Sequence, residues 1–438
     1  MNGWKNILIT SVIIILIVIS CNNQNDELKI VDTMLEDTSS YFYTDLNLYK
    51  NKNSKLPVGI FDSGTGGLTV FDAIVNFDKY NNKDHSYLSD GDSIRDFNEE
   101  CFIYLADQAN MPYGNYEAHN KTKLLKEHVL KDAQFLLSDK YYENSEDQDY
   151  LINKSPIKAL VIACNTATAY AKEDIENFVK KANLDIKVIG VIGAGVRASL
   201  VNISDDEDVS IAVMATAGTV SSNGYVKEIQ SQLKERNNTG TVDVFQQAGI
   251  GLAGAIDQAI EFIDPNADKP RDIYKGPSDK NENLIIDKNI LTRYNFDWSE
   301  NNMLFEGTKE NPTNIQINSV ENYISYHVTT LLEQIIKSEN PNKLKSIILG
   351  CTHYPFYTDI FNSKIEELRL YIENGKYIYK NILAEKIDFI DPAIFTAKEL
   401  YDYLAQEKLF NNGNITESEF YISVPNKTNR NIKTDKFG

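Results

Sequence analysis

Short apolar runs recur along the chain from about residue 57 onward, and each is followed by a turn and then by helical spacing. The runs are continuous rather than alternating, which is typical of strands covered on both faces of a parallel sheet. Between two of them, residues 322–337 place apolar side chains every three to four positions, as an amphipathic helix does. The pattern predicts an α/β fold, with strands in VGIF (58–61), CFIYLA (101–106), ALVIA (159–163), KVIGVI (187–192), IAVMA (211–215), SIILG (346–350) and IDFI (387–390).

The predicted strands form a loose internal repeat. VGIFDSGTGGLTV, from residue 58, pairs with IAVMATAGTVSS, from residue 211, and LVIACNTAT, from residue 160, pairs with IILGCTHYP, from residue 347. In each half, a strand with a Gly/Thr/Ser turn precedes a strand with a cysteine turn. We therefore expect two similar parallel-sheet α/β lobes related by a pseudo-two-fold axis. This symmetry predicts that the two cysteine turns face each other across the interlobe cleft.

The rest of the chain is divided by composition. Polar stretches rich in Asn and Asp precede and follow the predicted lobes, and a turn-rich stretch looks inserted on the surface of the second. The expected organisation is a polar tether at 21–55, lobe 1 at 56–183 and 393–410, lobe 2 at 184–392 with an insertion at about 263–318, and a polar tail at 411–438.

The N-terminus looks like a targeting segment. Lys5 precedes an apolar run at 7–20 that is short for a membrane span of about 20 residues and fits a secretory signal peptide at 1–20. The run ends in VISC, which resembles the lipobox of bacterial lipoproteins and implies cleavage before Cys21 and acylation of its thiol. The alternative is an uncleaved anchor helix. Both interpretations predict an extracytoplasmic protein attached to a membrane.

Composition narrows the partners and the state of the cysteines. The hydrophobic fraction of 42% is ordinary, and the net charge of -19 disfavours nucleic acid as a partner. With Cys21 assigned to lipid, Cys101, Cys164 and Cys351 remain. An odd number of cysteines argues against a disulfide framework and requires at least one free thiol.

The candidate catalytic residues lie at the predicted carboxyl ends of strands, where ligands bind in parallel α/β folds. Cys164 and Cys351 are expected there, each before a helix whose free N–H groups lower the pKa of a thiol. The alternative for either cysteine is a small buried hydrophobe. Asp62 directly follows a buried strand, which indicates a proton-handling carboxylate. The glycines after it either expose N–H donors to a carboxylate or only make a tight turn.

His353 lies two residues after Cys351 in the sequence, close enough to tune that thiol. A histidine beside a cysteine is also a potential zinc ligand. No CxxC or HxxxH spacing accompanies it, so we expect no metal site.

Together these motifs resemble the aspartate/glutamate racemase superfamily, and most closely the glutamate racemase family. The resemblance covers about residues 57–404 and implies an amino-acid racemase that needs no cofactor. One thiolate removes the α-proton of the substrate, and the opposite thiol delivers a proton to the other face. The matching segments are FDSGTGGLTV (61–70), MPYG (111–114), ACNTATA (163–169), GVIGAG (190–195), ATAGTVSSNGY (215–225), LGCTHYPF (349–356) and, more weakly, IDPA (390–393).

The resemblance also implies roles for individual residues. Cys164 acts on the D-enantiomer with help from Asp62, and Cys351 acts on the L-enantiomer with help from His353. The residues implied to hold the amino and carboxylate groups of the substrate are Asp62, Ser63, Asp107, Tyr113, Gly114, Asn165, Thr166, Thr352 and His353.

One segment departs from the glutamate racemase pattern. That family usually has a proline-containing stretch that ends in glutamate, whereas this chain has FQQAGIGLAGAID, Phe245 to Asp257. Aspartate or another small α-amino acid therefore stays open as the substrate beside glutamate. Two other functions also stay open: a lyase or decarboxylase that uses one cysteine, and a non-catalytic solute-binding lipoprotein. Family members often dimerise, so a homodimer is one expectation.

Overall fold

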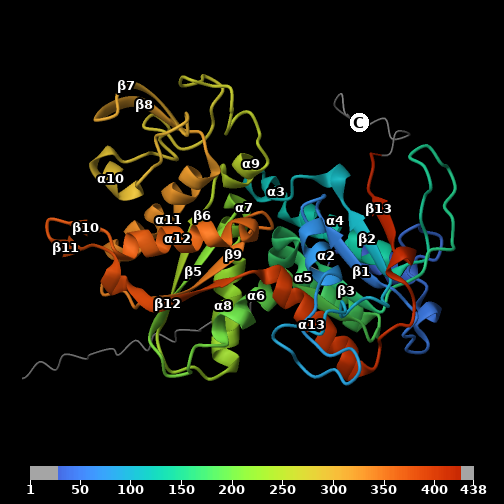
Figure 1. Ribbon diagram of the computed structural model, residues 1–438. Coiled ribbons are helices and arrows are strands. Elements are labelled where there is room, and N and C mark those ends of the chain that lie inside the picture. Colours follow the sequence, from blue (N-terminus) through green and yellow to red (C-terminus); the bar gives the residue numbers. More distant parts are fainter. Residues whose placement is uncertain (1–27, 426–438) are drawn as a thin grey trace, which may run out of the picture.

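The computed structural model describes residues 28–425. Two parallel sheets form the centres of two lobes that lie side by side (Figure 1). The sheet of lobe 1 has the strand order β13-β2-β1-β3-β4, and the sheet of lobe 2 has the order β12-β9-β5-β6. All neighbouring strands in both sheets run parallel. The predicted α/β class, with a parallel sheet in each lobe, is confirmed.

In lobe 1 the strands alternate their side chains between two layers of helices. Phe61 and Ile162 pack on one face, while Ile60 and Val161 pack on the other. Because both layers are apolar, every strand position of β1 is buried, which explains the continuous run. The elements of this lobe are β1 (Val58–Asp62), β2 (Phe102–Ala106), β3 (Ala159–Ile162), β4 (Lys187–Gly190), β13 (Glu419–Ile422), α2 (Leu68–Val75), α3 (Asn115–Ala118), α4 (Thr122–Leu137), α5 (Asn165–Lys181) and α13 (Pro392–Glu407).

Lobe 2 is built in the same way. Met214 and Leu349 pack on one face of its sheet, and Val213 and Ile348 pack on the other. The predicted amphipathic helix at 322–337 lies within α11 and ends at the same residue. The elements are β5 (Val209–Ala215), β6 (Val242–Ala248), β9 (Leu344–Gly350), β12 (Leu383–Ile390), α6 (Val191–Leu200), α7 (Ala217–Ser221), α8 (Gly224–Glu235), α9 (Leu252–Ile256), α11 (Val320–Lys337), α12 (Thr358–Arg369) and the small hairpin β10 (Ile372–Glu373) with β11 (Lys376–Tyr377).

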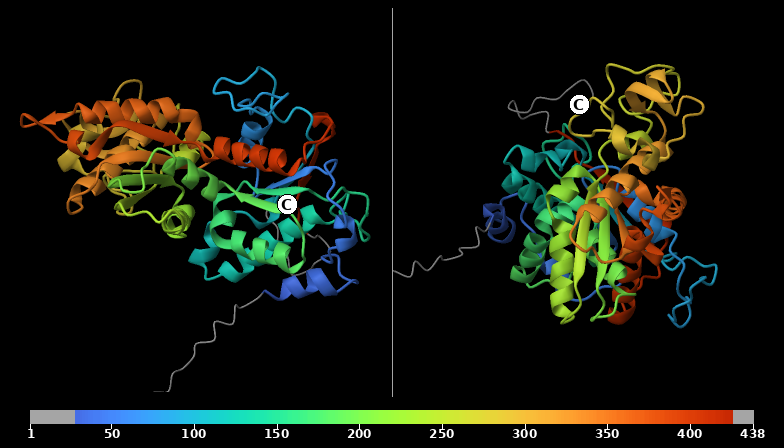
Figure 2. Two further views of the ribbon diagram at one scale, coloured as in Figure 1. Left: turned by 90° about the horizontal axis from the view of Figure 1, so that it is seen from below. Right: turned by 90° about the vertical axis from the view of Figure 1, so that its left-hand side faces the viewer.

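The boundary between the lobes lies later than expected. β4 pairs with β3, so residues 184–190 belong to lobe 1, and lobe 2 begins with α6. The chain returns to lobe 1 through α13, which packs against that sheet (Figure 2).

The predicted tether at 21–55 is wrong for residues 28–55. This stretch includes α1 (Lys29–Glu36), which buries Met34 completely in the core of lobe 1. Lys140 donates hydrogen bonds to the main-chain carbonyls of Ser40 and Tyr43, which fixes the following loop. The apolar residues that face the core are few and widely spaced, so the stretch reads as polar in the sequence. The predicted signal peptide and Cys21 lie outside the described residues.

The predicted polar tail at 411–438 is wrong for residues 411–425, because β13 extends the sheet of lobe 1 at the edge of β2.

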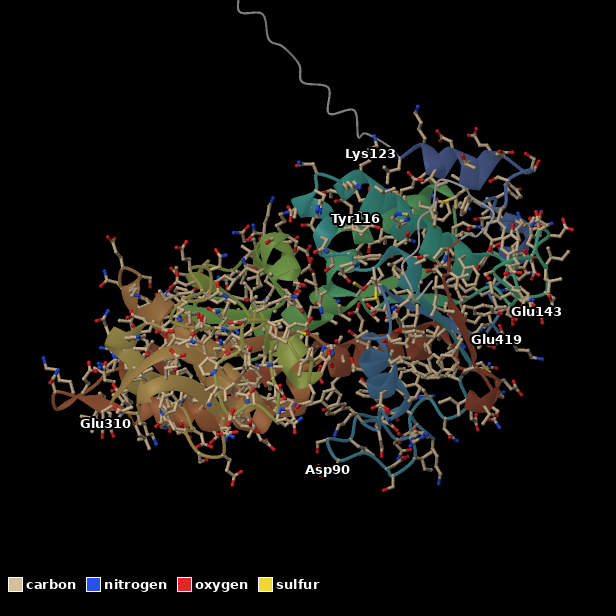
Figure 3. The ribbon with its side chains drawn as sticks, turned by 90° about the horizontal axis from the view of Figure 1, so that it is seen from above. Asp90, Tyr116, Lys123, Glu143, Glu310 and Glu419 are labelled. Atoms are coloured by element: carbon tan, nitrogen blue, oxygen red, sulfur yellow. The ribbon has the colours of Figure 1, made fainter. Side chains whose placement is uncertain are left out.

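The expectation that 263–318 only decorates the surface is also wrong. This segment contains α10 (Leu291–Tyr294) and a hairpin of β7 (Met303–Thr308) and β8 (Asn311–Ile317). Glu310 at the turn of the hairpin lies at the far end of lobe 2 (Figure 3). Tyr294, Met303 and Ile315 are buried in the core of that lobe.

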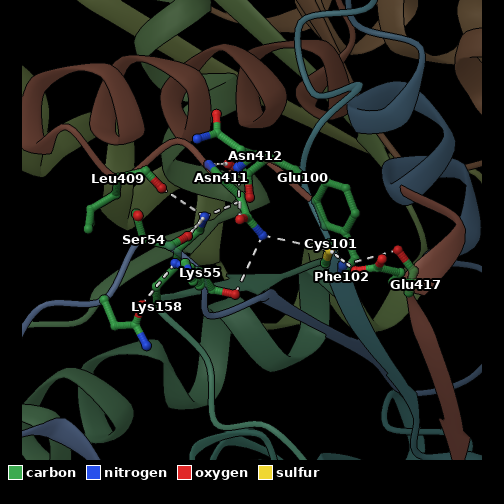
Figure 4. Close-up of polar contacts among 12 residues, drawn as sticks. Ser54, Lys55, Glu100, Cys101, Phe102, Lys158, Leu409, Asn411, Asn412 and Glu417 are labelled. Atoms are coloured by element: carbon green, nitrogen blue, oxygen red, sulfur yellow. Dashed lines mark hydrogen bonds and ion pairs between the residues drawn. The ribbon is translucent and has the colours of Figure 1, made fainter. Parts of the chain in front are cut away.

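A buried polar cluster lies at the end of lobe 1 where β2 and β3 begin (Figure 4). Lys158 forms an ion pair with Glu100 at 2.6 Å, and both side chains are 2% exposed. The Lys158 ammonium also donates to the carbonyls of Ser54 and Leu409 at 2.8 Å. The cluster therefore joins segments that are far apart in the sequence.

No helix within residues 28–425 has the length and apolar character needed to cross a membrane.

Candidate active site

The two cysteine turns meet at one cleft between the lobes. Cys164 follows β3 and Cys351 follows β9, and both thiols are buried and free. The cleft has a volume of about 620 Å³. We call it the interlobe cleft, and it is lined by Asp62, Ser63, Gly64, Thr65, Gly66, Thr69, Met111, Ala163, Cys164, Asn165 and Thr166 from lobe 1 and by Thr216, Thr219, Ala253, Asp257, Gly350, Cys351, Thr352 and His353 from lobe 2.

On the side of lobe 1, a carboxylate lies against the first thiol. Asp62 ends β1, and its Oδ2 accepts hydrogen bonds from the N–H groups of Gly64 at 3.2 Å and Gly67 at 2.9 Å. The thiol of Cys164 donates to the Oγ of Ser63 at 3.6 Å, and the charge of Asp62 is close enough to raise the pKa of this thiol. Only glycine fits at position 67, since a Cβ there would lie 2.5 Å from the Cβ of Asp62. The Gly-rich turn therefore fixes the carboxylate beside Cys164.

On the side of lobe 2, the second thiol has an imidazole next to it. The Sγ of Cys351 lies 3.6 Å from Nδ1 of His353, and Nε2 of His353 lies 3.2 Å from Oδ1 of Asp257. A carboxylate behind an imidazole orients the ring. Each thiol thus has its own acid–base group, a carboxylate for Cys164 and a histidine for Cys351.

The expectation that helix starts lower the pKa of the two thiols is wrong for this structure. Cys164 does cap α5, where its Sγ accepts from the N–H of Ala167 at 3.4 Å. Burial nevertheless raises the pKa of Cys164 to about 12, and the charge of Asp62 adds to the effect. Burial also raises the pKa of Cys351 to about 12. Cys351 is followed by a short 3₁₀ turn, η4 (Tyr354–Tyr357), before α12 begins. Desolvation of the thiolate outweighs the N–H groups at both positions.

Eight of the predicted site residues line the interlobe cleft, and three do not. Tyr113 is buried and donates a hydrogen bond to Oδ2 of Asp107 at 2.5 Å, inside lobe 1. Gly114 packs against Gly218 of lobe 2, where a Cβ on Gly218 would lie 2.9 Å from the Cα of Gly114. The residues that do line the cleft are Asp62, Ser63, Cys164, Asn165, Thr166, Cys351, Thr352 and His353.

Some cleft residues were not assigned from the sequence. Thr216 follows β5 as Ser63 follows β1, so the internal repeat already contained the signal that places it at the cleft. Met111 begins the MPYG segment, but the resemblance implied no role for its side chain. None of the cleft residues within 28–425 is Lys or Arg, so hydroxyl, amide, imidazole and main-chain N–H groups are the donors available to an anion. In the same residues, no group of three or more His, Cys, Asp or Glu side chains is arranged to hold a metal ion.

The fold and the site define a two-lobed α/β protein with a thiol from each lobe on one cleft. No protein-family model matches the chain. It is 31% identical over 193 residues to the glutamate racemase of Sulfurihydrogenibium sp. (strain YO3AOP1), covering 44% of this chain and 54% of that protein. It is 24% identical over 368 residues to the glutamate racemase of Thermoanaerobacter sp. (strain X514), covering 84% and 88%.

The matched part thus spans about half the length of the first relative. Among solved structures, the glutamate racemase isoform RacE1 of Bacillus anthracis superposes with a TM-score of 0.47 at 22% identity. That superposition covers 85% of this chain and 90% of the other.

Proposed function

We propose that the protein is a cofactor-independent amino-acid racemase that acts on glutamate and inverts its Cα by proton transfer between Cys164 and Cys351. The observation that carries the proposal is the presence of two free thiols, one from each lobe, on the same cleft. A proton removed from one face of a carbon must be replaced from the other face for the configuration to invert. A pair of thiols that flank one cavity meets this requirement, whereas a lyase or decarboxylase needs only one.

The high pKa of the thiols sets a condition on the mechanism. A rise from 9.0 to about 12 means that forming the thiolate costs about 4 kcal/mol more than in water. An α-amino acid brings its own ammonium group, and a cation close to a thiol favours the thiolate. Substrate binding therefore activates the base, with Asp62 or His353 taking up the thiol proton. Hydroxyl groups and the N–H groups at the start of α5 bind the carboxylates.

Exchange in deuterated water tests the proposal. The protein is incubated with L- or D-glutamate, and separately with aspartate, and α-deuterium and chirality are followed. Incorporation with inversion supports the racemase, and Cys164→Ser and Cys351→Ser should each abolish it. Binding without exchange supports a solute-binding protein, release of carbon dioxide supports a decarboxylase, and preference for aspartate changes the substrate. A fully active single-cysteine variant would exclude the two-thiol mechanism.

We also propose that the chain is an exported lipoprotein anchored through Cys21, supported by the apolar run at 7–20 and the VISC sequence. Metabolic labelling with an alkyne fatty acid tests this, since the label should be lost in Cys21→Ser. The homodimer stays a prediction, which the mass of the protein in solution tests.

A further inference from the structure

The edge strand β13 of lobe 1 ends beside a loop that lines the interlobe cleft. β13 pairs with β2 along its length, and the N–H of Ser423 continues the pairing by donating to the carbonyl of Ala106 at 2.8 Å. This register places Ser423 where β2 ends and the loop 107–114 begins. We call residues 107–114 the wall loop, because Met111 within it lines the cleft.

Ser423 contacts the wall loop through both functions of its hydroxyl group. Its O–H donates to Oδ1 of Asp107 at 2.6 Å, and its oxygen accepts from the N–H of Ala109 at 2.9 Å. Asp107 is 1% exposed, so this hydrogen bond to a carboxylate is shielded from water on the side of Asp107. Hydrogen bonds to charged groups are stronger than those between neutral groups.

Asp107 also forms hydrogen bonds with other residues of the wall loop. Its carboxylate also accepts from the side-chain amide of Asn110 at 2.9 Å and from the hydroxyl of Tyr113 at 2.5 Å. The hydroxyl of Tyr113 lies 2.7 Å from Asp132 of α4 as well. Both ends of the wall loop are therefore fixed to one buried carboxylate.

The far side of the wall loop touches both lobes. A Cβ on Gly64 would lie 2.4 Å from Sδ of Met111, so the loop rests on the turn that holds Asp62. At the other end of the loop, Gly114 packs against Gly218 of lobe 2. A shift of the loop would change the shape of the cleft from both sides.

We propose that β13 and Ser423 form a clasp that holds the wall loop in the shape required for substrate binding, and that Ser423 is a positioning residue for the reaction. The proposal rests on the racemase function proposed above. It assigns a role in the active site to a segment that follows the last helix and touches no substrate.

Three variants of the full chain test the clasp. Ser423→Ala removes both contacts, and Ser423→Thr keeps the hydroxyl group. Ser418→Ala is the matched control, since the Oγ of Ser418 accepts from the N–H of Phe102 at 3.1 Å and fastens the opposite end of the same strand pair. The measurements are kcat, KM, the melting temperature, and hydrogen exchange of the peptide that covers the wall loop.

For Ser423→Ala we expect KM to rise about tenfold with kcat changed less than about threefold, because the loss of a hydrogen bond to a charged group affects binding rather than the thiols. The wall loop should exchange faster, whereas Ser418→Ala should lower the melting temperature equally and leave KM unchanged. Ser423→Thr should restore KM. The clasp is refuted if Ser423→Ala and Ser418→Ala behave alike in KM and in exchange. If the wild type does not racemise glutamate or aspartate, the function fails, and hydrogen exchange alone then decides on the clasp.

Discussion

Replacement of Asp62 by asparagine separates two effects of this carboxylate on Cys164. As a charge, Asp62 opposes formation of the thiolate and contributes to the raised pKa of Cys164. As a base, it is the carboxylate that lines the cleft beside Cys164 and is able to take up the proton of the thiol. The amide of asparagine keeps the size of the side chain but removes both the charge and the basicity. The two effects change measurable quantities in opposite directions.

The magnitudes follow from electrostatics and from general base catalysis. Two unit charges about 4 Å apart repel by ~1 kcal/mol in water and by ~4 kcal/mol at an effective dielectric constant of 20. Loss of ~1 kcal/mol of repulsion makes the Cys164 thiolate roughly fivefold more abundant at a given pH. Loss of a positioned base lowers the rate by about 100-fold or more. We therefore expect Asp62→Asn to have a more reactive thiol and a much lower kcat.

Two assays read these effects separately. Alkylation by iodoacetamide at pH 8, followed by mass spectrometry of the peptide that contains Cys164, reports the thiolate. Chiral chromatography of glutamate reports racemisation. Asp72→Asn, on the exposed side of α2, controls for the loss of one negative charge. An Asp62→Asn enzyme with kcat within tenfold of the wild type, or with slower alkylation of Cys164, would refute this reasoning.

Two further predictions concern stability. Lys158→Met should lower the free energy of unfolding by about 3–5 kcal/mol because it leaves Glu100 buried without its cation. Lys386→Met removes an exposed cation beside Asp388 and should change the free energy of unfolding by less than about 1 kcal/mol in urea titrations. Burial lowers the pKa of His327 from 6.5 to about 4, so its contribution is complete above pH 6.5 and is lost as the pH falls toward 4. Unfolding at pH 7 and pH 4 should therefore show about 3 kcal/mol less acid sensitivity in His327→Gln than in the wild type.

Each stability prediction has a clear contrary result. If Lys158→Met costs no more than Lys386→Met, the buried ion pair does not hold the segments together. If His327→Gln unfolds with the same pH dependence as the wild type, this histidine is not neutral in the folded state at low pH.

The central strands of both lobes could be predicted from the sequence because they are covered on two faces. Every residue of β1, β3 and β5 is buried, so the apolar runs are unbroken, and Asp62 at the end of β1 and Cys164 after β3 stand out. Two edge strands, β6 and β13, could not be predicted in this way. The strand β6 is mostly half-buried and contains Asp243 and two glutamines, and β13 is mostly exposed. Their hydrogen bonds to a neighbouring strand stabilise them, and a single sequence does not display that neighbour.

The positions of the two thiols in one cleft followed from the internal repeat, but their acidity did not. Proximity to a helix start is visible in the sequence, whereas the loss of water around Cys164 and Cys351 depends on how the lobes close. Tyr113 and Asp107 show the same limit. A tyrosine and an aspartate are suited to substrate binding, but in the structure the hydroxyl of Tyr113 donates to Asp107. Tyr113 also contacts Asp132, and Asp107 accepts from Ser423, so both side chains have partners inside lobe 1.

The closure of the first sheet by its last strand has a consequence for biosynthesis. Asp107 and Ser423 are 316 positions apart, so a growing polypeptide contains both cysteine turns long before the strand that borders β2 has been translated. Chains that stopped before Ser423 would carry both thiols without the hydrogen bonds from Ser423 to the wall loop. The order of synthesis thus adds the proposed clasp only after both thiols and the wall loop have been made.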